Sequence, residues 1–257
     1  MTQAEKLAQR SKSVVKANEL IQKSRFSLSL QQQKMVLYLI SKIEPQDEDF
    51  KLYEFSIAEF CKVCGIDYQS GRNYELLKEQ IKALRDKSLW VMLDNGEETT
   101  LSWIEKPYIS KKNGIIKVRL DKDMKPYLLQ LKKQFTSYEL IWTLRFDSKY
   151  STRLYELIKS IHYHENQPYT RSYSLDELRK VLGAENYTVY QDFKKRALLP
   201  AIEEVNKYSD KHIEYSVIKN GRSVVGVEFT ITTKPPVERI NTRAMIEQEL
   251  DKSQKPE

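Results

Sequence analysis

The chain repeats one segment of its own sequence, and this repeat constrains the fold more than any other feature. Residues 55–65 return as residues 173–183, an offset of 118 positions. In both copies a serine is followed three positions later by a glutamate, as in a helix capping box, and an apolar stripe runs between them and a closing glycine. The residues are Ser56, Glu59 and Gly65 in the first copy and Ser174, Glu177 and Gly183 in the second. The repeat predicts two copies of one module, and hence a duplicated binding unit.

The similarity extends beyond this segment in both directions. Upstream, the apolar positions of residues 36–43 align with those of residues 154–161 at the same offset. Downstream, the turn at residues 112–114 returns at residues 219–221, and Asn-Gly between β-prone runs is a strong hairpin signal. Each copy therefore reads as helix, short strand, helix, turn, longer helix and hairpin, which is the winged-helix order. We predict an α+β fold of two tandem winged-helix domains related by internal duplication.

The same order leaves two uses open, because helix-turn-helix units bind DNA in many proteins and dock other proteins in some. The DNA major groove admits an α-helix, which favours the first use. Residues 135–146 are apolar enough to pack, so the connection between the copies is not expected to be a floppy linker. The predicted divisions are a polar N-terminal arm at 1–24, a first domain at 25–130, a second domain at 131–233 and a flexible C-terminal tail at 234–257.

Composition narrows the class of protein. The 257 residues carry a formal net charge of +7, which suits a polyanionic partner without proving one. The N-terminus lacks the apolar core of a signal peptide, no apolar run could span a bilayer, and two cysteines give no disulfide framework. No glycine-rich phosphate loop is present, so we expect no bound nucleotide or other cofactor. These features predict a cytoplasmic protein without its own nucleotide motor.

The long helix expected at residues 72–88 carries charges of both signs. Its apolar face consists of Tyr74, Leu77, Ile81 and Leu84. On the opposite face, carboxylates would be repelled by DNA phosphates, so this helix suits protein contact better than base readout. We predict dimerisation through Glu75 and Glu79 in the first domain, with auxiliary DNA contacts from Arg72, Asn73, Lys78 and Lys82.

The long helix expected at residues 188–207 has a cleaner basic face. Its core side consists of Phe193, Ala197, Leu198, Ile202 and Val205, and Pro200 should kink it. Recognition helices place their N-terminal turns against base edges. The predicted DNA-binding residues there are Thr188 at the cap, Gln191, Lys194, Lys195 and Arg196. The alternative interpretation is an ordinary solvated basic face.

Both hairpins add positive charge. Residues 106–125 hold seven lysines and arginines against two aspartates, among them Lys111 and Lys112, and Lys219 and Arg222 flank the second hairpin turn. Wing tips of this kind usually contact backbone phosphates and carry no sequence information. A lysine-rich turn can equally serve solubility alone.

Two short patterns suggest metal chemistry. Cys61 and Cys64 have the spacing of redox and zinc sites, but one pair cannot complete a tetrahedral zinc site, so we interpret both as buried helix cysteines. His162 and His164 match the His-hydrophobic-His pair of rolling-circle nicking enzymes, in which a tyrosine attacks DNA. Those enzymes carry the pair on a sheet strand, whereas here it ends a predicted helix. We predict neither catalytic residues nor a metal site.

Several segments resemble one known family. Residues 14–20 and 28–34 resemble the opening of the iteron-binding plasmid replication initiators. Residues 135–140 and 148–157 resemble their inter-domain segment, and residues 193–206 their second recognition helix. The resemblance covers about residues 14–232 with several motifs in order. It implies a tandem winged-helix protein that binds repeated sequences at a plasmid origin, recruits host helicase and polymerase machinery, and forms a repressive dimer through its N-terminal module.

The sequence therefore predicts a non-enzymatic initiator that binds double-stranded origin DNA at direct repeats. Its expected partners are that DNA, host replication proteins such as a helicase or initiator, and a second copy of itself in a monomer–dimer equilibrium. Two alternatives remain. One is a nicking endonuclease that uses His162, His164 and a tyrosine, and the other is a dedicated winged-helix transcriptional repressor.

Overall fold

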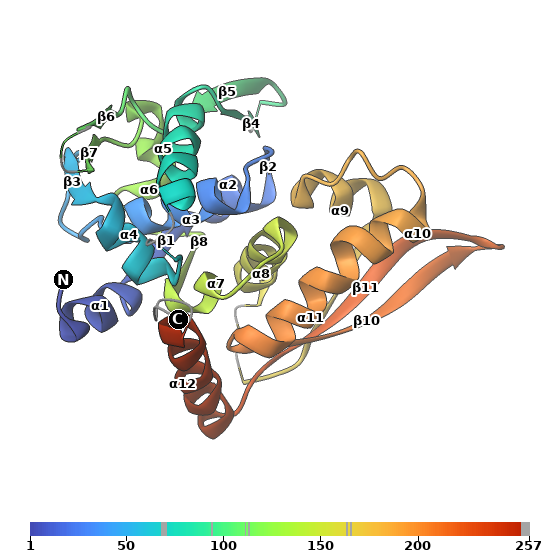
Figure 1. The fold of residues 1–257 in the computed structure, drawn as a ribbon. Coiled ribbons are helices and arrows are strands. Elements are labelled where there is room, and N and C mark those ends of the chain that lie inside the picture. Colours follow the sequence, from blue (N-terminus) through green and yellow to red (C-terminus); the bar gives the residue numbers. More distant parts are fainter. Residues whose placement is uncertain are drawn as a thin grey trace.

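The structure is a computed structural model that describes residues 1–67, 71–93, 95–110, 112, 114–162, 164 and 166–252, and only the backbone of residues 71–74. Figure 1 shows two modules, the first at the upper left and the second at the right with a long projecting hairpin. Both have the predicted winged-helix order of helices and strands, so the predicted α+β fold is confirmed. No helix among the described residues is both long and apolar enough to cross a membrane.

Module 1 contains a buried helix, α3 (Leu30–Ile40), and two small sheets. Its helices pack Leu77, Ile81 and Leu84 inward, as predicted, while the side chain of Tyr74 lies outside the described part. The two sheets have the strand orders β2-β4-β5 and β3-β7-β6. The elements are β2 (Ser24–Arg25), α3 (Leu30–Ile40), β3 (Tyr53–Ser56), α4 (Ile57–Cys64), α5 (Gly71–Arg85), β4 (Ser88–Met92), β5 (Glu98–Ser102), β6 (Tyr108–Ile109) and β7 (Ile115–Val118).

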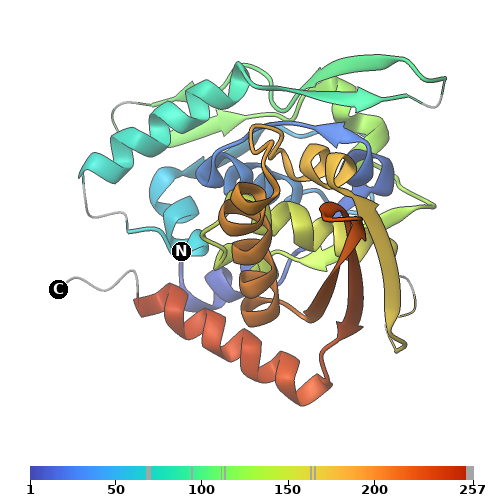
Figure 2. The ribbon, with the colours of Figure 1, turned by 90° about the vertical axis from the view of Figure 1, so that its right-hand side faces the viewer.

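Module 2 repeats this order with a single sheet, β10-β11-β9. Figure 2 shows its long helix in front, with the hairpin strands to one side. The elements are α8 (Lys149–Ile161), β9 (Tyr169–Ser174), α9 (Leu175–Leu182), α10 (Tyr190–Phe193), η2 (Lys194–Leu198), α11 (Leu199–Tyr208), β10 (Lys211–Asn220) and β11 (Ser223–Thr233).

The repeated segment forms α4 and α9, and the copies are capped differently. In module 2, Ser174 N–H donates to Glu177 (2.9 Å) and Glu177 N–H donates to the Ser174 hydroxyl (3.2 Å), so the box closes. In module 1 the Ser56 hydroxyl accepts from Glu59 N–H (2.9 Å), but the Glu59 carboxylate accepts instead from Tyr38. The predicted second half of the first capping box is therefore wrong, because a buried tyrosine takes the carboxylate.

The N-terminal residues are not an arm but part of module 1. They form α1 (Gln3–Arg10), β1 (Ser13–Ala17) and α2 (Asn18–Gln22). Arg10 is fully buried and donates to Val63 O (2.8 Å), and Val14 is fully buried. Because polar side chains make these contacts with distant segments, the local sequence pattern did not show that the segment packs.

The predicted flexible tail is also wrong over most of its length, since Pro236–Lys252 form helix α12. The helix runs back below α11 toward α1 in Figure 2. Ile246 and Leu250 are buried, and Asp251 forms ion pairs with Lys6 (2.8 Å) and Arg10 (3.1 Å). Few apolar residues and several ion pairs with residues far away in sequence hold this helix in place. Its composition is therefore mostly polar, like that of a disordered tail.

The connecting segment packs, as the sequence predicted. It contains η1 (Lys122–Met124), α6 (Lys125–Leu128), β8 (Phe135–Glu139) and α7 (Ile141–Leu144), and Leu140, Leu144 and Phe146 are fully buried. β8 pairs antiparallel with β1, from Ser13 opposite Glu139 to Ala17 opposite Phe135. This pairing crosses the predicted boundary between residues 130 and 131.

Helix α8 joins the modules through buried polar groups. Lys16 from β1 forms an ion pair with Glu156 (2.6 Å), and the Tyr138 hydroxyl also donates to Glu156. Burial lowers the pKa of Lys16, although the Glu156 carboxylate opposes the shift. Arg153 donates to Ser24 O (3.0 Å) on one side and to Val181 O of α9 (2.8 Å) on the other. The two modules therefore share α8 as a common packing element.

Candidate nucleic-acid interface

The second long helix presents the predicted basic residues to solvent. Gln191, Lys195 and Arg196 are exposed and Lys194 is half-buried. All five predicted core residues, Phe193, Ala197, Leu198, Ile202 and Val205, are buried on the opposite side. Among the described residues, Arg196 forms one ion pair, a long one with Asp192 (3.9 Å), in which both side chains are more than half exposed. Such a pair is weak, so the guanidinium is available to an external anion.

The start of this helix differs from the prediction at its cap. The N-cap residue is Val189, which makes no side-chain hydrogen bond, and helix α10 begins at Tyr190. Thr188 lies one position earlier and its carbonyl accepts from the Arg179 guanidinium (2.9 Å). The predicted capping role of Thr188 is therefore wrong, although its side chain is exposed beside the helix start.

Pro200 is accommodated by a π-helical turn. Residues 194–198 form this turn between α10 and α11, and Leu199 N–H donates to Lys194 O five residues back. Pro200 follows at the start of α11, where its missing N–H and its ring would otherwise conflict with the preceding helical turn. The predicted irregularity is present as a widened turn, and it contains Lys194, Lys195 and Arg196.

Arg179 holds this helix in position, and the sequence reasoning did not identify it. Its guanidinium lies over the Phe193 ring at 5.5 Å and donates to Thr188 O. It stands at the position of Cys61 in the first copy, which is fully buried. The sequence did contain a signal for this role, since a charged residue in the second copy replaces a residue that is buried in the first. Arg179 thereby fixes α9 against the first turn of the recognition helix.

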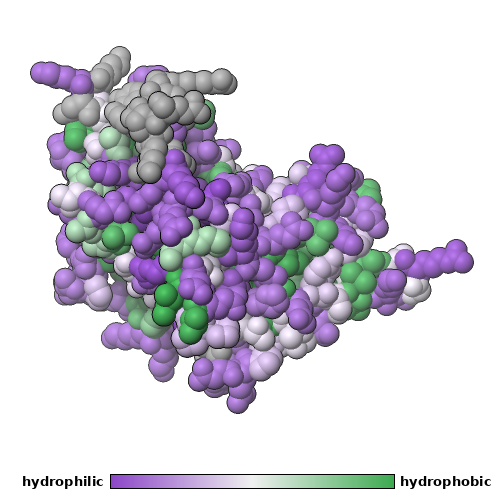
Figure 3. Space-filling model, turned by 60° about the horizontal axis from the view of Figure 1, so that its bottom comes forward, coloured by the Kyte–Doolittle hydropathy of each residue, from purple (hydrophilic) through white to green (hydrophobic). Residues whose placement is uncertain are grey.

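The second wing is long and carries both basic and apolar groups. β10 and β11 pair up to Asn220 opposite Ser223, which leaves Gly221 and Arg222 as the turn. Lys219 and Arg222 are exposed there. Val217, Ile218 and Val225 are also more than a third exposed, and Figure 3 shows hydrophobic groups beside hydrophilic ones on the projecting arm at its right. β9 pairs with β11 only as far as Gly226, so no third strand flanks the outer hairpin in the part of the chain that the structure describes.

Helix α5 of module 1 pairs its lysines internally. Lys78 binds Glu75 (2.9 Å) and Lys82 binds Glu79 (2.6 Å), each three residues apart. Both carboxylates are more than half exposed, so the outer face carries both signs, as the sequence indicated. Arg72 and Asn73 lie among the residues whose side chains are outside the described part. The roles predicted for these six residues stay predictions.

The first wing is much shorter than the second. β6 and β7 pair at Tyr108 opposite Lys117 and Ile109 opposite Ile116. Lys112 is exposed in the connecting turn, and Lys111 lies outside the described residues. Lys106 lies over the exposed Tyr108 ring at 5.8 Å. Module 1 also inserts the β4–β5 hairpin between α5 and this wing, an addition that module 2 lacks within its described residues.

Cys61, Cys64 and His162 take the structural positions predicted for them, and His164 lies beyond the helix end. Cys61 and Cys64 are buried in α4, and burial raises the pKa of each thiol to about 12. His162 follows the last residue of α8, and its Nε2 lies 2.8 Å from Gln167 O and its Nδ1 3.2 Å from Lys211 Nζ. Both ring nitrogens therefore face protein partners. Among the described residues, no three histidine, cysteine or carboxylate side chains converge as metal ligands.

Comparison with known proteins places this geometry among replication proteins. The family model described as "Initiator Replication protein, WH1" matches residues 13–159, and that described as "Initiator Rep protein, WH2" matches residues 174–231. A "Replication initiation protein" of Escherichia coli is 28% identical over 228 residues, covering 85% of this chain and 69% of that protein. The "PI protein" of Escherichia coli is 29% identical over 153 residues, covering 53% of this chain and half of that protein.

A solved structure shows the same fold. The crystal structure of the Pi initiator protein in complex with iteron DNA matches with a TM-score of 0.72 and 21% identity, covering 88% of this chain and 98% of that one. The match extends over both modules, so their arrangement in one chain is shared as well as their individual folds.

Proposed function

The chain belongs to the initiator replication protein family, and from that membership we propose that it starts replication by binding direct repeats in double-stranded origin DNA. The observation that carries this proposal is the exposed Gln191–Lys195–Arg196 face in the first turns of the second recognition helix. The solved relative was crystallised with iteron DNA, which supports the same class of ligand for this chain. Module 2 is the main reader of sequence.

Each contact class has a separate role in this proposal. Gln191 and Arg196 have the donors and acceptors that distinguish base pairs in the major groove. Lys219 and Arg222 at the wing tip are placed to contact phosphates, which adds affinity on any sequence. Module 1 contributes auxiliary contacts through α5 and its short wing, where internal ion pairs weaken the attraction to DNA.

Two further kinds of partner belong to this proposal, namely host replication proteins and a second copy of the chain. The chain carries no glycine-rich phosphate loop, so an initiator of this kind would recruit host helicase or initiator proteins to open and copy the origin. Self-association through Glu75 and Glu79 on α5 would provide a dimer that represses replication. Both carboxylates are more than half exposed, which supports an accessible surface there.

The test is a paired titration of the full chain on duplexes from its own replicon and on scrambled duplexes. We expect footprints on direct repeats, tighter binding to them than to scrambled DNA, and a log–log salt slope of about −0.9 per phosphate contacted. Binding that ignores salt, or that treats both duplexes alike, would refute the proposal. A repressor would footprint an operator but fail to sustain a minimal replicon, which a plasmid maintenance assay would reveal.

The nicking alternative has its own test. His162 has protein partners at both ring nitrogens, which leaves no free nitrogen for a metal without rearrangement. We therefore propose that the protein does not cleave DNA. Incubation with supercoiled origin DNA and Mg²⁺ or Mn²⁺ should leave it intact. Nicking that disappears in a His162→Ala/His164→Ala variant would establish the enzyme class instead.

A further inference from the structure

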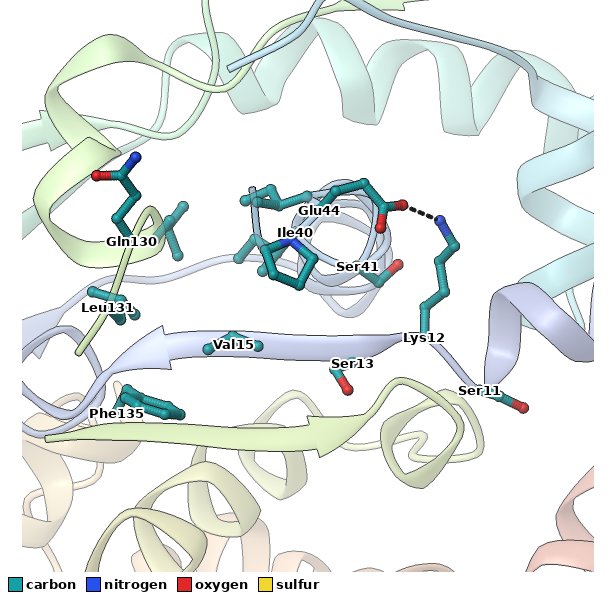
Figure 4. Close-up of a pocket in the computed structure, with 13 residues that line it drawn as sticks. Ser11, Lys12, Ser13, Val15, Ile40, Ser41, Glu44, Gln130, Leu131 and Phe135 are labelled. Atoms are coloured by element: carbon teal, nitrogen blue, oxygen red, sulfur yellow. Dashed lines mark hydrogen bonds and ion pairs between the residues drawn. The ribbon is translucent and has the colours of Figure 1, made fainter. Parts of the chain in front are cut away.

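A cavity of about 590 Å³ lies beside β1 and is lined by residues of module 1 and of the connecting segment. Figure 4 shows β1 between β8 on one side and the cavity on the other. The wall is mostly apolar, and its volume falls in the range of small ligand and peptide sites. The apolar lining residues are Val15, Ile40, Ile43, Pro45, Leu128, Leu131 and Phe135.

The edge of β1 that borders this cavity has no strand partner. Leu140 N–H donates to Lys12 O and Asn18 N–H donates to Gln134 O, so the even-numbered residues of β1 bond to β8. In an antiparallel pair the alternate residues direct their N–H and C=O groups to the other side. Within the described part of the chain, no hydrogen bond involves the backbone of Ser13 or Val15. A strand edge with unpaired groups is a template for another strand.

The loop that closes the cavity is strained and positively charged. Gln130 and Gln134 have φ angles of 49° and 52°, in the left-handed region that residues other than glycine seldom adopt. Between them, Leu131 lines the cavity and is followed by the exposed Lys132 and Lys133. At the opposite end, the carboxylate of Glu44 is already paired with Lys12 (2.8 Å). The charge left available at the rim is therefore positive.

We propose that β1 and this cavity bind an extended acidic segment of a partner protein. The segment adds a third strand to β1–β8 through the backbone groups of Ser13 and Val15, and it places one aliphatic side chain in the apolar cavity. Carboxylates on the segment pair with Lys132 and Lys133. Strand addition of this kind takes affinity from backbone hydrogen bonds and specificity from the side-chain pocket. The site is separate from the DNA-reading face and does not depend on DNA binding.

The probe is a display library of random heptapeptides selected on the full-length protein. Selected peptides should combine carboxylates with an alternating aliphatic residue. Val15→Pro removes an outward N–H, which an edge strand tolerates, and also replaces one side chain of the cavity wall. It should weaken the binding of a synthetic selected peptide about fivefold or more. Lys132→Glu/Lys133→Glu should weaken it about tenfold or more, while Lys180→Glu on α9, an exposed lysine in module 2, should leave it unchanged.

Hydrogen exchange locates the bound peptide independently of any substitution. The amides of Ser13 and Val15 should exchange quickly in the free protein and become protected when the peptide binds, since each then donates to the added strand. This readout serves also if Val15→Pro does not fold. Selection of no peptide, of peptides with helical periodicity, or of peptides indifferent to the Lys132/Lys133 reversal would overturn the proposal. An edge that only pairs with a second copy, seen by sedimentation, would overturn it as well.

Discussion

Module 1 and module 2 end their repeated helices with the same left-handed glycine but pack it against different partners. A Cβ on Gly65 would lie 2.4 Å from the Leu250 side chain of α12, and one on Gly183 would lie 2.6 Å from Phe26 O. The first contact joins module 1 to the C-terminal helix, and the second joins module 2 to the start of module 1. Both copies therefore keep the left-handed glycine turn, and in each copy the missing side chain lets a different segment pack closely against it.

The modules differ most where side chains leave the core. The core faces of α5 and of α10–α11 are buried in both copies, through Leu77, Ile81 and Leu84 in the first and Phe193, Ala197 and Leu198 in the second, while the outer faces diverge. On α5 the lysines are paired with carboxylates three residues away, and within the described residues Lys194 and Lys195 of η2 have no ion pair. The core pattern fixes the fold, so binding residues are free to change without cost to packing.

The largest expected effect concerns the junction that makes these modules one body. Glu156→Gln removes the charge that compensates Lys16, whose side chain is 4% exposed. Breaking a buried ion pair on one side costs about 3–5 kcal/mol, so we expect a loss of that order in the free energy of unfolding by urea. Adding Lys16→Met removes the closer of the two buried cations that face residue 156 and should recover part of the loss, while Arg153, 4.0 Å from the Glu156 carboxylate, remains.

An exposed ion pair serves as a control that separates the effect of burial from the loss of any ion pair. Glu79→Gln breaks an exposed pair with Lys82 and should change stability by less than about 1 kcal/mol. If Glu156→Gln cost no more than Glu79→Gln, the polar cluster at α8 would not hold the modules together. Two separate unfolding transitions in the parent protein would lead to the same conclusion.

The next effect separates the two glycines. Alanine in the left-handed region costs about 1–2 kcal/mol, which Gly221→Ala should show alone because nothing lies within 4 Å of its Cβ. Gly183→Ala should lose about 1–3 kcal/mol more, since a backbone carbonyl cannot move aside easily. Gly65→Ala should fall between them, because rotation of the Leu250 side chain can relieve the 2.4 Å contact but not those with its Cβ (3.1 Å) and Cα (3.2 Å). Urea unfolding of the three variants gives the order, and equal losses would mean that the close approaches are not rigid.

These cases also show what the sequence could and could not predict. The sequence predicted the glycine helix ends and the core faces, because apolar side chains recur every 3 to 4 residues along a helix. Repetition of these local patterns 118 residues later then predicted the duplicated winged-helix order. The Glu59 carboxylate could not be assigned, because Tyr38 competes for it from another helix. The π turn before Pro200 could not be predicted as such. The sequence showed only that a proline inside a helix must cause some irregularity, and it did not show which kind.

The terminal segments were missed for a common physical reason. Asp251 is held by Lys6 and Arg10, more than 240 residues away along the chain, and β1 pairs with β8 across the first module. Contacts of this kind leave no periodic signal in either partner. At the candidate interface, the exposed face of the second helix was predictable from its charges, while the Arg179 contact that positions it depended on the fold.

The outer faces of α5 and of the second long helix should differ in their effect on DNA specificity, and this effect should be of intermediate size. Arg196→Ala should reduce the difference in binding free energy between repeat and scrambled DNA by about 1–3 kcal/mol, which is the value of a bidentate base contact. Lys82→Ala should narrow it by less than about 1 kcal/mol, because Glu79 already neutralises that lysine. Lys219→Ala should weaken both duplexes together. Equal losses of specificity at positions 82 and 196 would show that both helices read bases.

The smallest effect tests the two helix caps. Ser174→Ala removes the two hydrogen bonds of the Ser174 hydroxyl, one accepted from Glu177 N–H and one donated to the Glu177 carboxylate, and keeps the bond from the backbone N–H of residue 174. It should cost about 1–2 kcal/mol of stability near neutral pH, and Ser56→Ala, which removes one hydrogen bond, about 0.5–1 kcal/mol. Hydrogen bonds from the Ser174 backbone N–H and hydroxyl lower the pKa of Glu177 below its ordinary value of 4.5. A carboxyl with a lowered folded pKa stabilises the folded state above its unfolded pKa, and that contribution fades as pH falls through the folded value.

The difference between the caps should therefore depend on pH in module 2. Between pH 7 and about 5 the Ser174→Ala loss should stay constant, and below pH 4.5 it should shrink as Glu177 becomes protonated in the parent protein. A Glu177→Gln variant should remove this pH dependence while keeping the Ser174 hydroxyl as an acceptor for the residue 177 N–H. Urea unfolding at several pH values measures all three proteins. A Ser174→Ala loss that stays constant down to low pH would show that the cap acts only through the bond from the residue 177 N–H to the hydroxyl, and a loss that grows toward low pH would have the wrong sign for a closed box.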